Sequence, residues 1–151
     1  MTAETTLRLA RDFNNIIAIK EASGNITQMD DIIKNKPAHF DVISGDDGIT
    51  FPLITLGAVG VISVIGNALP AEFSRMVRLA LNGDYESART IHHKFAELFK
   101  LLFVDGNPAG VKAMLHAMGL IENPLRLPLV PTRLTTMEKI SAILKELDIR
   151  I

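Results

Sequence analysis

The feature that most restricts the fold is a series of three short apolar runs separated by single amphipathic segments. The runs are IIAIK at residues 16–20, FDVIS at 40–44 and VISVI at 61–65. They are rich in β-branched side chains and lack polar alternation, which is typical of strands buried on both faces of a parallel sheet. A single helix between successive strands makes the strands parallel neighbours joined by right-handed crossovers.

Helical spacing of apolar residues fills the intervals between these runs. The strands start about 25 and then about 20 residues apart, close to the unit length implied by roughly 250 residues for eight units in a closed barrel. From residue 70 onward every periodic segment is helical. The sequence predicts an α/β chain with βα units over residues 1–82 and a helical region over 83–151. The expected helices are 2–12, 26–34, 49–56, 71–81, 85–104, 108–118 and one that begins near 135.

Composition narrows the class of protein. The chain has 151 residues, 48% of them hydrophobic, and a formal net charge of -1. Nearly balanced charge gives no electrostatic reason to expect nucleic acid or an anionic membrane as a partner. No window reaches the roughly 20 apolar residues of a spanning helix. Cysteine is absent, which removes disulfides and thiolate metal sites and fits a cytoplasmic location.

Lys20 suggests chemistry because it ends the first apolar run. Desolvation at the mouth of a buried strand disfavours the charged ammonium, and a neutral amine can attack a carbonyl to form a Schiff base. The alternative is a lysine that extends to solvent and pairs with a carboxylate. Glu21 is a poor direct partner, because successive strand residues point to opposite faces.

Small and acidic residues follow the other two runs. Ser44-Gly45 and Gly66 would let the backbone approach a small substrate closely, although glycines that only close tight βα turns give the same pattern. Asp46 and Asp47 could bind a metal, but paired aspartates at such a junction more often cap a helix. We therefore expect no metal site. A phosphate site in the last loops of a barrel is the competing hypothesis. The remaining histidines and cations are expected to be structural or solvated: His39, His92, His93, His116, Lys100, Lys112 and Arg126.

Several ordered motifs resemble one known family. IAIKEASG at residues 17–24 carries the lysine, and SGDD at 44–47 and GVISV at 60–64 follow in order. Matches continue at LFV, residues 102–104, and through Asn107-Pro108, Val111-Lys112 and the LRLPL of 125–129. Together they resemble the dihydrodipicolinate synthase / N-acetylneuraminate lyase family, and its synthase branch in particular. The resemblance covers nearly the whole chain.

This resemblance implies a fold and an activity. The fold would be a partial (β/α)8 TIM barrel holding strands six to eight, followed by a C-terminal helical region. The activity would be that of a class I lyase that condenses pyruvate with aspartate semialdehyde to 4-hydroxy-tetrahydrodipicolinate in lysine and diaminopimelate biosynthesis. No cofactor or catalytic metal is implied. Lys20 would form the Schiff base with pyruvate, Ile62 would supply a backbone contact to bound pyruvate, and Gly45 would line the same pocket.

The chain departs from the family in length, since it matches only the C-terminal half of members about twice as long. The proton-relaying threonine and tyrosines and the arginine that holds the semialdehyde are missing, and Tyr85 is not expected to replace them. We therefore expect a C-terminal fragment that is inactive alone. Two alternatives stay open. One is another pyruvate aldolase of the superfamily, such as N-acetylneuraminate lyase or a keto-deoxy sugar acid aldolase. The other is a non-catalytic assembly module.

An isolated set of three parallel strands would have open edges and one apolar face without cover. Exposed apolar patches of this kind usually find a partner. We therefore expect the chain to form a homo-oligomer, and the resemblance implies a tetramer for full-length members of the family.

Overall fold

A three-stranded parallel sheet with the order β1-β2-β3 organises the first part of the chain. Its strands are β1 (Ala18–Glu21), β2 (Asp41–Ser44) and β3 (Gly60–Val61). The computed structural model describes residues 1–149. The predicted α/β class and the parallel pairing are confirmed. In register, Lys20 aligns with Ile43, and Ile43 aligns with Gly60.

The third strand is shorter than the sequence predicts. It ends at Val61, and Ile65–Asn67 forms a short 3₁₀ helix, η1, so residues 64–66 are not a strand end. In the described chain β3 pairs only with β2, and the ladder stops where the Ile62 N–H donates to the Ser44 carbonyl at 2.9 Å. Because β2 ends at Ser44, the parallel ladder does not extend past Ile62, and strand propensity alone does not keep residues 64–66 extended.

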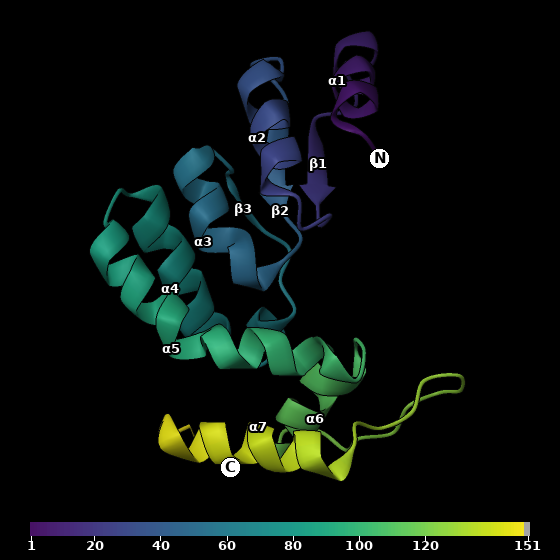
Figure 1. Ribbon diagram of the computed structural model, residues 1–151, viewed down its shortest axis with the longest axis vertical. Helices are drawn as coiled ribbons and strands as arrows, with labels where there is room; N and C mark the ends of the chain where they lie inside the picture. The colour runs from purple at the N-terminus through teal and green to yellow at the C-terminus, as the bar shows by residue number, and fades with distance from the viewer. Residues whose placement is uncertain (150–151) are drawn as a thin grey trace. The chain divides into compact units, whose positions relative to one another are not determined.

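Three helices lie side by side along one face of this sheet (Figure 1). They are α1 (Ala3–Asp12), α2 (Ile26–Asn35) and α3 (Asp47–Leu56). Thr2, Asn25 and Asp46 cap their N-termini with side-chain oxygens, which satisfy backbone N–H groups that a first turn leaves unpaired. Gly57 ends α3 with φ 117°, a left-handed conformation that favours glycine.

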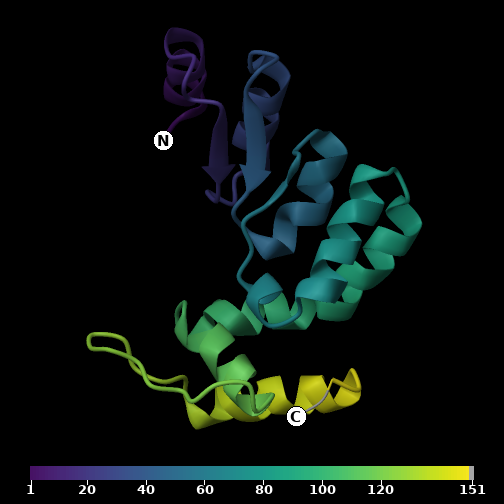
Figure 2. The ribbon, with the colours of Figure 1, turned by 180° about the vertical axis from the view of Figure 1, so that it is seen from behind.

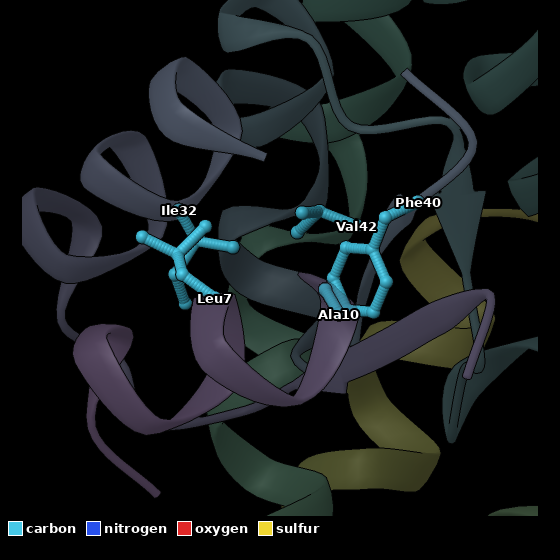
Figure 3. Close-up of a cluster of buried hydrophobic side chains, with 5 residues drawn as sticks. All are labelled: Leu7, Ala10, Ile32, Phe40 and Val42. Atoms are coloured by element: carbon cyan, nitrogen blue, oxygen red, sulfur yellow. The ribbon is translucent and has the colours of Figure 1, made fainter. Parts of the chain in front are cut away.

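A cluster of apolar side chains joins these helices to the sheet. Figure 3 shows Leu7 and Ala10 of α1, Ile32 of α2, and Phe40 and Val42 at β2 packed against one another. Ile32 and Val42 are fully buried. The central strand therefore turns Val42, and with it Ser44 two residues on, toward the helices.

The rest of the chain is helical, as predicted. The helices are α4 (Pro70–Leu81), α5 (Tyr85–Val104), α6 (Ala109–Ala117) and α7 (Leu134–Glu146). The chain forms two compact units. The sheet unit comprises residues 1–63 and 72–92, and the helical unit comprises residues 64–71 and the chain from residue 93 on. No helix in residues 1–149 is long and apolar enough to cross a membrane.

In the helical unit, α6 and α7 lie side by side in both views (Figures 1 and 2). Their inner faces bury Met114, Ile140 and Leu144 completely. Gly110 of α6 lies against the backbone of α5, where a Cβ at residue 110 would overlap the Leu102 carbonyl. The absence of a side chain at Gly110 thus permits the close approach of α6 to α5.

Asp105 fixes the start of α7. Its Oδ2 accepts hydrogen bonds from the Arg133 N–H at 3.1 Å and the Thr136 hydroxyl at 2.5 Å, and its Oδ1 lies 2.6 Å from Arg133 Nε. The Thr136 hydrogen bond and those from Arg133, with the Arg133 charge, hold the pKa of the Asp105 carboxyl below its ordinary value, against the opposing effect of desolvation. The carboxylate thus links the loop after α5 to the first turn of α7, where negative charge is also favoured by the helix dipole.

Replacing Gly110 with alanine should destabilise the chain. The added Cβ meets backbone, which no rotamer change can move away, so we expect a loss of about 3 kcal/mol in the free energy of unfolding. Gly60→Ala is the matched control, because no heavy atom lies within 4 Å of a Cβ built there, and it should stay within about 1 kcal/mol of the wild type. Chemical denaturation of the two variants makes the comparison, and equal stabilities would contradict the packing described for α5 and α6.

Asp105→Asn should remove a pH-dependent part of the stability. A carboxyl whose pKa is lower in the folded state stabilises the fold above its ordinary pKa, near ~3.9, and loses this contribution as the pH falls through the folded value. Denaturation near neutral pH should therefore show Asp105→Asn to be less stable than the wild type, with the difference shrinking toward pH ~3. The exposed Asp30, changed to asparagine, is the control. A difference that does not change with pH would contradict the assignment.

Candidate active site

The register of the sheet brings Lys20, Gly45 and Ile62 to the same face. Lys20 and Ile43 are aligned neighbours, and so are Ile43 and Gly60, and aligned residues of parallel strands point the same way. Side chains alternate along a strand, so Gly45 and Ile62, each two residues further on, share this face. The hydrogen bond from the Ile62 N–H to Ser44 O continues the ladder to residue 62. The three residues named from the sequence thus meet at the carboxyl ends of adjacent strands.

Within the sheet unit this face is not covered by helices, whereas the opposite face is (Figure 1). Lys20 is exposed and Ile62 is 51% exposed. On the covered face Glu21 is 4% exposed and Ser44 is fully buried. An uncovered face in the sheet unit agrees with the expectation for three strands isolated from the rest of a barrel. The exposure of Lys20 contradicts the expectation that this lysine is desolvated.

The stem of Lys20 lies over Gly45. A Cβ built on Gly45 would lie 3.0 Å from Lys20 Cε, 3.1 Å from Lys20 Cγ and 2.7 Å from the Cβ of Ala22. The absence of a side chain at residue 45 therefore leaves the space through which the lysine extends. Among the described residues, the Lys20 amine makes no hydrogen bond or ion pair.

Glu21 organises the turn after β1 from the other side of the sheet. Its Oε1 accepts from the Ser23 N–H at 2.7 Å, and its Oε2 accepts from Gln28 Nε2 at 3.2 Å. Gly24 then adopts φ 73°, and Asn25 caps α2. The prediction that Glu21 is a poor partner for Lys20 is confirmed by their opposite faces. The role of Glu21 in closing this turn was not predicted from the sequence.

A second polar cluster lies beneath Gly45 on the covered side. Thr50 Oγ1 lies 3.0 Å from Ser44 Oγ and 2.7 Å from Asp46 O, and Ser44 Oγ donates to the same carbonyl at 2.9 Å. Asp46 Oδ1 accepts from the Gly48 N–H at 2.9 Å, which confirms the capping interpretation. The buried Thr50 was not singled out in the sequence. Within residues 1–149, no three His, Cys, Asp or Glu side chains are grouped to hold a metal ion.

The other candidates make contacts that do not involve Lys20, Gly45 or Ile62 among the contacts described below. His39 is exposed, and His116 Nδ1 contacts the Ile121 carbonyl at 3.0 Å. The His92 ring packs 5.7 Å from the Phe51 ring. Lys100 makes an exposed 3.9 Å ion pair with Glu97, as expected of a surface charge. Lys112 does not fit that expectation, because it is half-buried and donates a hydrogen bond to the Pro124 carbonyl.

The chain resembles one family of proteins along its length. The model of the dihydrodipicolinate synthetase family matches residues 1–147. The 4-hydroxy-tetrahydrodipicolinate synthase of Phocaeicola vulgatus is 85% identical over 150 residues, which cover 99% of this chain and 50% of that protein. The chain therefore spans about half the length of the curated relatives it matches.

Solved structures agree in fold. Dihydrodipicolinate synthase from Thermotoga maritima matches with a TM-score of 0.94 and 41% identity, over 98% of this chain and 51% of that one. The chloride-inhibited enzyme from Acinetobacter baumannii, complexed with pyruvate, matches with a TM-score of 0.93 and 37% identity, over 98% of this chain and 50% of that one. On the family match over residues 1–147, the chain belongs to the dihydrodipicolinate synthetase family.

Proposed function

We propose that this chain carries the Schiff-base lysine of a 4-hydroxy-tetrahydrodipicolinate synthase, and that the lysine is Lys20. The observation that carries the proposal is the position of Lys20 at the carboxyl end of β1, on one face with Gly45 and Ile62. Functional groups of parallel α/β proteins lie at these strand ends. The pyruvate complex of the Acinetobacter baumannii relative supports pyruvate as the first substrate.

The proposed chemistry needs only the amine of Lys20 to begin. Its nitrogen attacks the keto carbon of pyruvate, and loss of water from the carbinolamine gives a protonated imine. Loss of a proton from the adjacent methyl carbon then gives an enamine. That carbon attacks the aldehyde carbon of aspartate semialdehyde and forms the new carbon–carbon bond, and the aldehyde oxygen takes up a proton to become the 4-hydroxyl group. The amino group from the semialdehyde then attacks the imine carbon, which closes the ring and releases the Lys20 amine. No cofactor enters these steps.

The proposed hydrogen bond between Ile62 and the bound pyruvate can form in only one direction, with Ile62 as the acceptor. The Ile62 N–H already donates to the Ser44 carbonyl, so only the Ile62 carbonyl oxygen remains for the substrate. A carbonyl accepts hydrogen bonds and does not donate them. Its partner would therefore be the hydroxyl of the carbinolamine or the N–H of the protonated imine, and not the carboxylate of pyruvate.

The finer description of the fold belongs to the same proposal. Residues 1–82 would hold the last three βα units of a TIM barrel, with β1, β2 and β3 as its sixth to eighth strands, and residues 83–151 would form the C-terminal helical region. The chain spans about half of its relatives, and its only tyrosine, Tyr85, packs edge-on to Phe51 at 6.4 Å. We infer that the chain alone has the nucleophile without the rest of the catalytic machinery.

Exposed apolar side chains support self-association of the chain. The side chains of Ile17, Val59 and Ile62 are 64%, 44% and 51% exposed. Contact between apolar surface and water is unfavourable, so a patch of this kind tends to be covered by a partner. A homo-oligomer in the cytoplasm, without nucleic acid or membrane, is the proposed state. Because the chain spans only about half the length of its relatives, a non-catalytic assembly module is the second candidate function. A different pyruvate aldolase would share Lys20 and differ in its second substrate.

A chimera tests the proposed activity directly. The half of the Phocaeicola vulgatus synthase that this chain matches is replaced by this chain, and condensation of pyruvate with aspartate semialdehyde is measured. We expect turnover by the chimera and none by the isolated chain. Reduction with borohydride in the presence of pyruvate should leave a 1-carboxyethyl group on the Lys20 nitrogen, located by peptide mass spectrometry, because hydride addition to the imine carbon traps the imine as a stable secondary amine.

Lys20→Arg is the decisive variant, since it keeps the charge and removes the nucleophilic amine. It should abolish both labelling and turnover in the chimera. Lys100→Arg, at an exposed lysine paired with Glu97, should leave both unchanged. An active chimera that carries Lys20→Arg would refute the role of Lys20. A folded chimera that is labelled but converts only another aldehyde would instead favour the aldolase alternative.

Gly45→Ala should impair the same chimera by displacing Lys20. The new Cβ would lie 2.7 Å from Ala22 Cβ and 3.0 Å from Lys20 Cε, which is overpacking worth about 1–3 kcal/mol. We expect slower borohydride labelling of Lys20 and a lower unfolding midpoint. Ala22→Gly in the Gly45→Ala background removes the nearest atom and should restore part of the stability. Labelling at the wild-type rate in Gly45→Ala would show that residue 45 does not position the lysine.

A further inference from the structure

The helical unit contains a cavity of about 460 Å³ between the start of α6 and the proline-rich segment before α7. Its wall is formed by Pro108, Lys112, Pro124, Leu125, Arg126 and Leu129. All six residues belong to the helical unit, so the cavity does not depend on the sheet unit. Its volume falls within the roughly 300–1,000 Å³ typical of small-molecule sites.

Two cations and no carboxylate line this cavity. Lys112 is half-buried, and its ammonium donates one hydrogen bond to the Pro124 carbonyl, which leaves two of its three donors for another acceptor. Arg126 is exposed, and its guanidinium has no hydrogen bond or ion pair among the described residues. Pro108 immediately precedes α6, whose N-terminus adds positive potential. Every charged element at the cavity therefore favours an anion.

The rest of the wall is apolar. The apolar part of the wall consists of Pro108, Pro124, Leu125 and Leu129. A bare inorganic ion would leave this apolar surface in contact with water. A ligand that combines a carboxylate with a compact apolar body would use both parts of the wall. The planar donors of Arg126 suit a carboxylate, which they can bind in a bidentate manner.

We propose that this cavity is a binding site for a small organic carboxylate with an apolar body, separate from the Lys20 face and independent of the proposed lyase activity. Lys112 anchors the segment through Pro124 and contributes charge, whereas Arg126 makes the main contact with the carboxylate. The apolar residues select against small hydrated anions.

Titration of the intact chain with benzoate, followed by amide chemical shifts in NMR, tests the proposal. Benzyl alcohol probes the apolar body without charge, and inorganic phosphate probes charge without an apolar body. Benzoate should shift the amides of residues 108–129 and bind more tightly than either probe. Arg126→Gln should weaken benzoate binding about ten-fold or more, as expected for loss of a charged hydrogen bond. The Arg126 guanidinium makes no hydrogen bond or ion pair with a described residue, and the substitution keeps the backbone carbonyl that accepts from Leu129 N–H, so this variant should remain folded.

Lys100→Gln is the control, because it removes an exposed cation that does not line the cavity. It should bind benzoate like the wild type. The proposal is overturned if benzoate shifts no amide in residues 108–129, or if Arg126→Gln binds it as tightly as the wild type does. Binding of benzyl alcohol or phosphate as tightly as benzoate would overturn the assigned ligand class.

Discussion

The in-register pairing of β2 with both of its neighbours is the constraint on which the sheet unit depends. Val42 and Ser44 face the helices, so Ile43 and Gly45 must face the other way. Lys20 and Gly60 are aligned with Ile43 and therefore lie on the same face as Ile43. A shift of one residue would place Lys20 among α1, α2 and α3 and turn Glu21 outward. The buried position of Val42 in the apolar cluster prevents this shift. Packing on the helix-covered face of the sheet thereby determines which side chains lie on the opposite face.

The same alternation separates two kinds of polar group. Glu21, Ser44 and Thr50 are buried, and their side chains bond to the turns and helix starts that follow the strands. Because the Glu21 carboxylate is held by Ser23 and Gln28, it is not available to neutralise Lys20. Strand-end residues on the covered face thus build the loops, and those on the open face remain available for chemistry. The KEASG run at residues 20–24 contains both kinds of residue in adjacent positions.

Much of this arrangement could be predicted from the sequence, because it depends on local signals. The helices and their caps at Thr2, Asp46 and Gly57 follow from periodicity and end chemistry, and the face of Glu21 follows from strand alternation. The predictions that failed depend on contacts between distant segments. Val64 and Ile65 were predicted to be strand, yet the ladder with β2 stops at Ile62 because β2 ends at Ser44. Lys112 read as a surface charge, but its position is set by Pro124, 12 residues away.

Exposure of the Lys20 face has a consequence for reactivity. The proposed Schiff-base chemistry needs a substrate that is held in place against the amine. Lys20 on β1 and Ile62 just after β3 are both exposed on this face, with β2 between their strands. A segment or partner that covers the face from β1 to β3 would bury the apolar side chain of Ile62 and would also enclose the space around Lys20. Apolar association and formation of the substrate site are therefore coupled on this face, so a change that weakens the covering contact should slow the reaction of Lys20 even where it touches no part of the lysine.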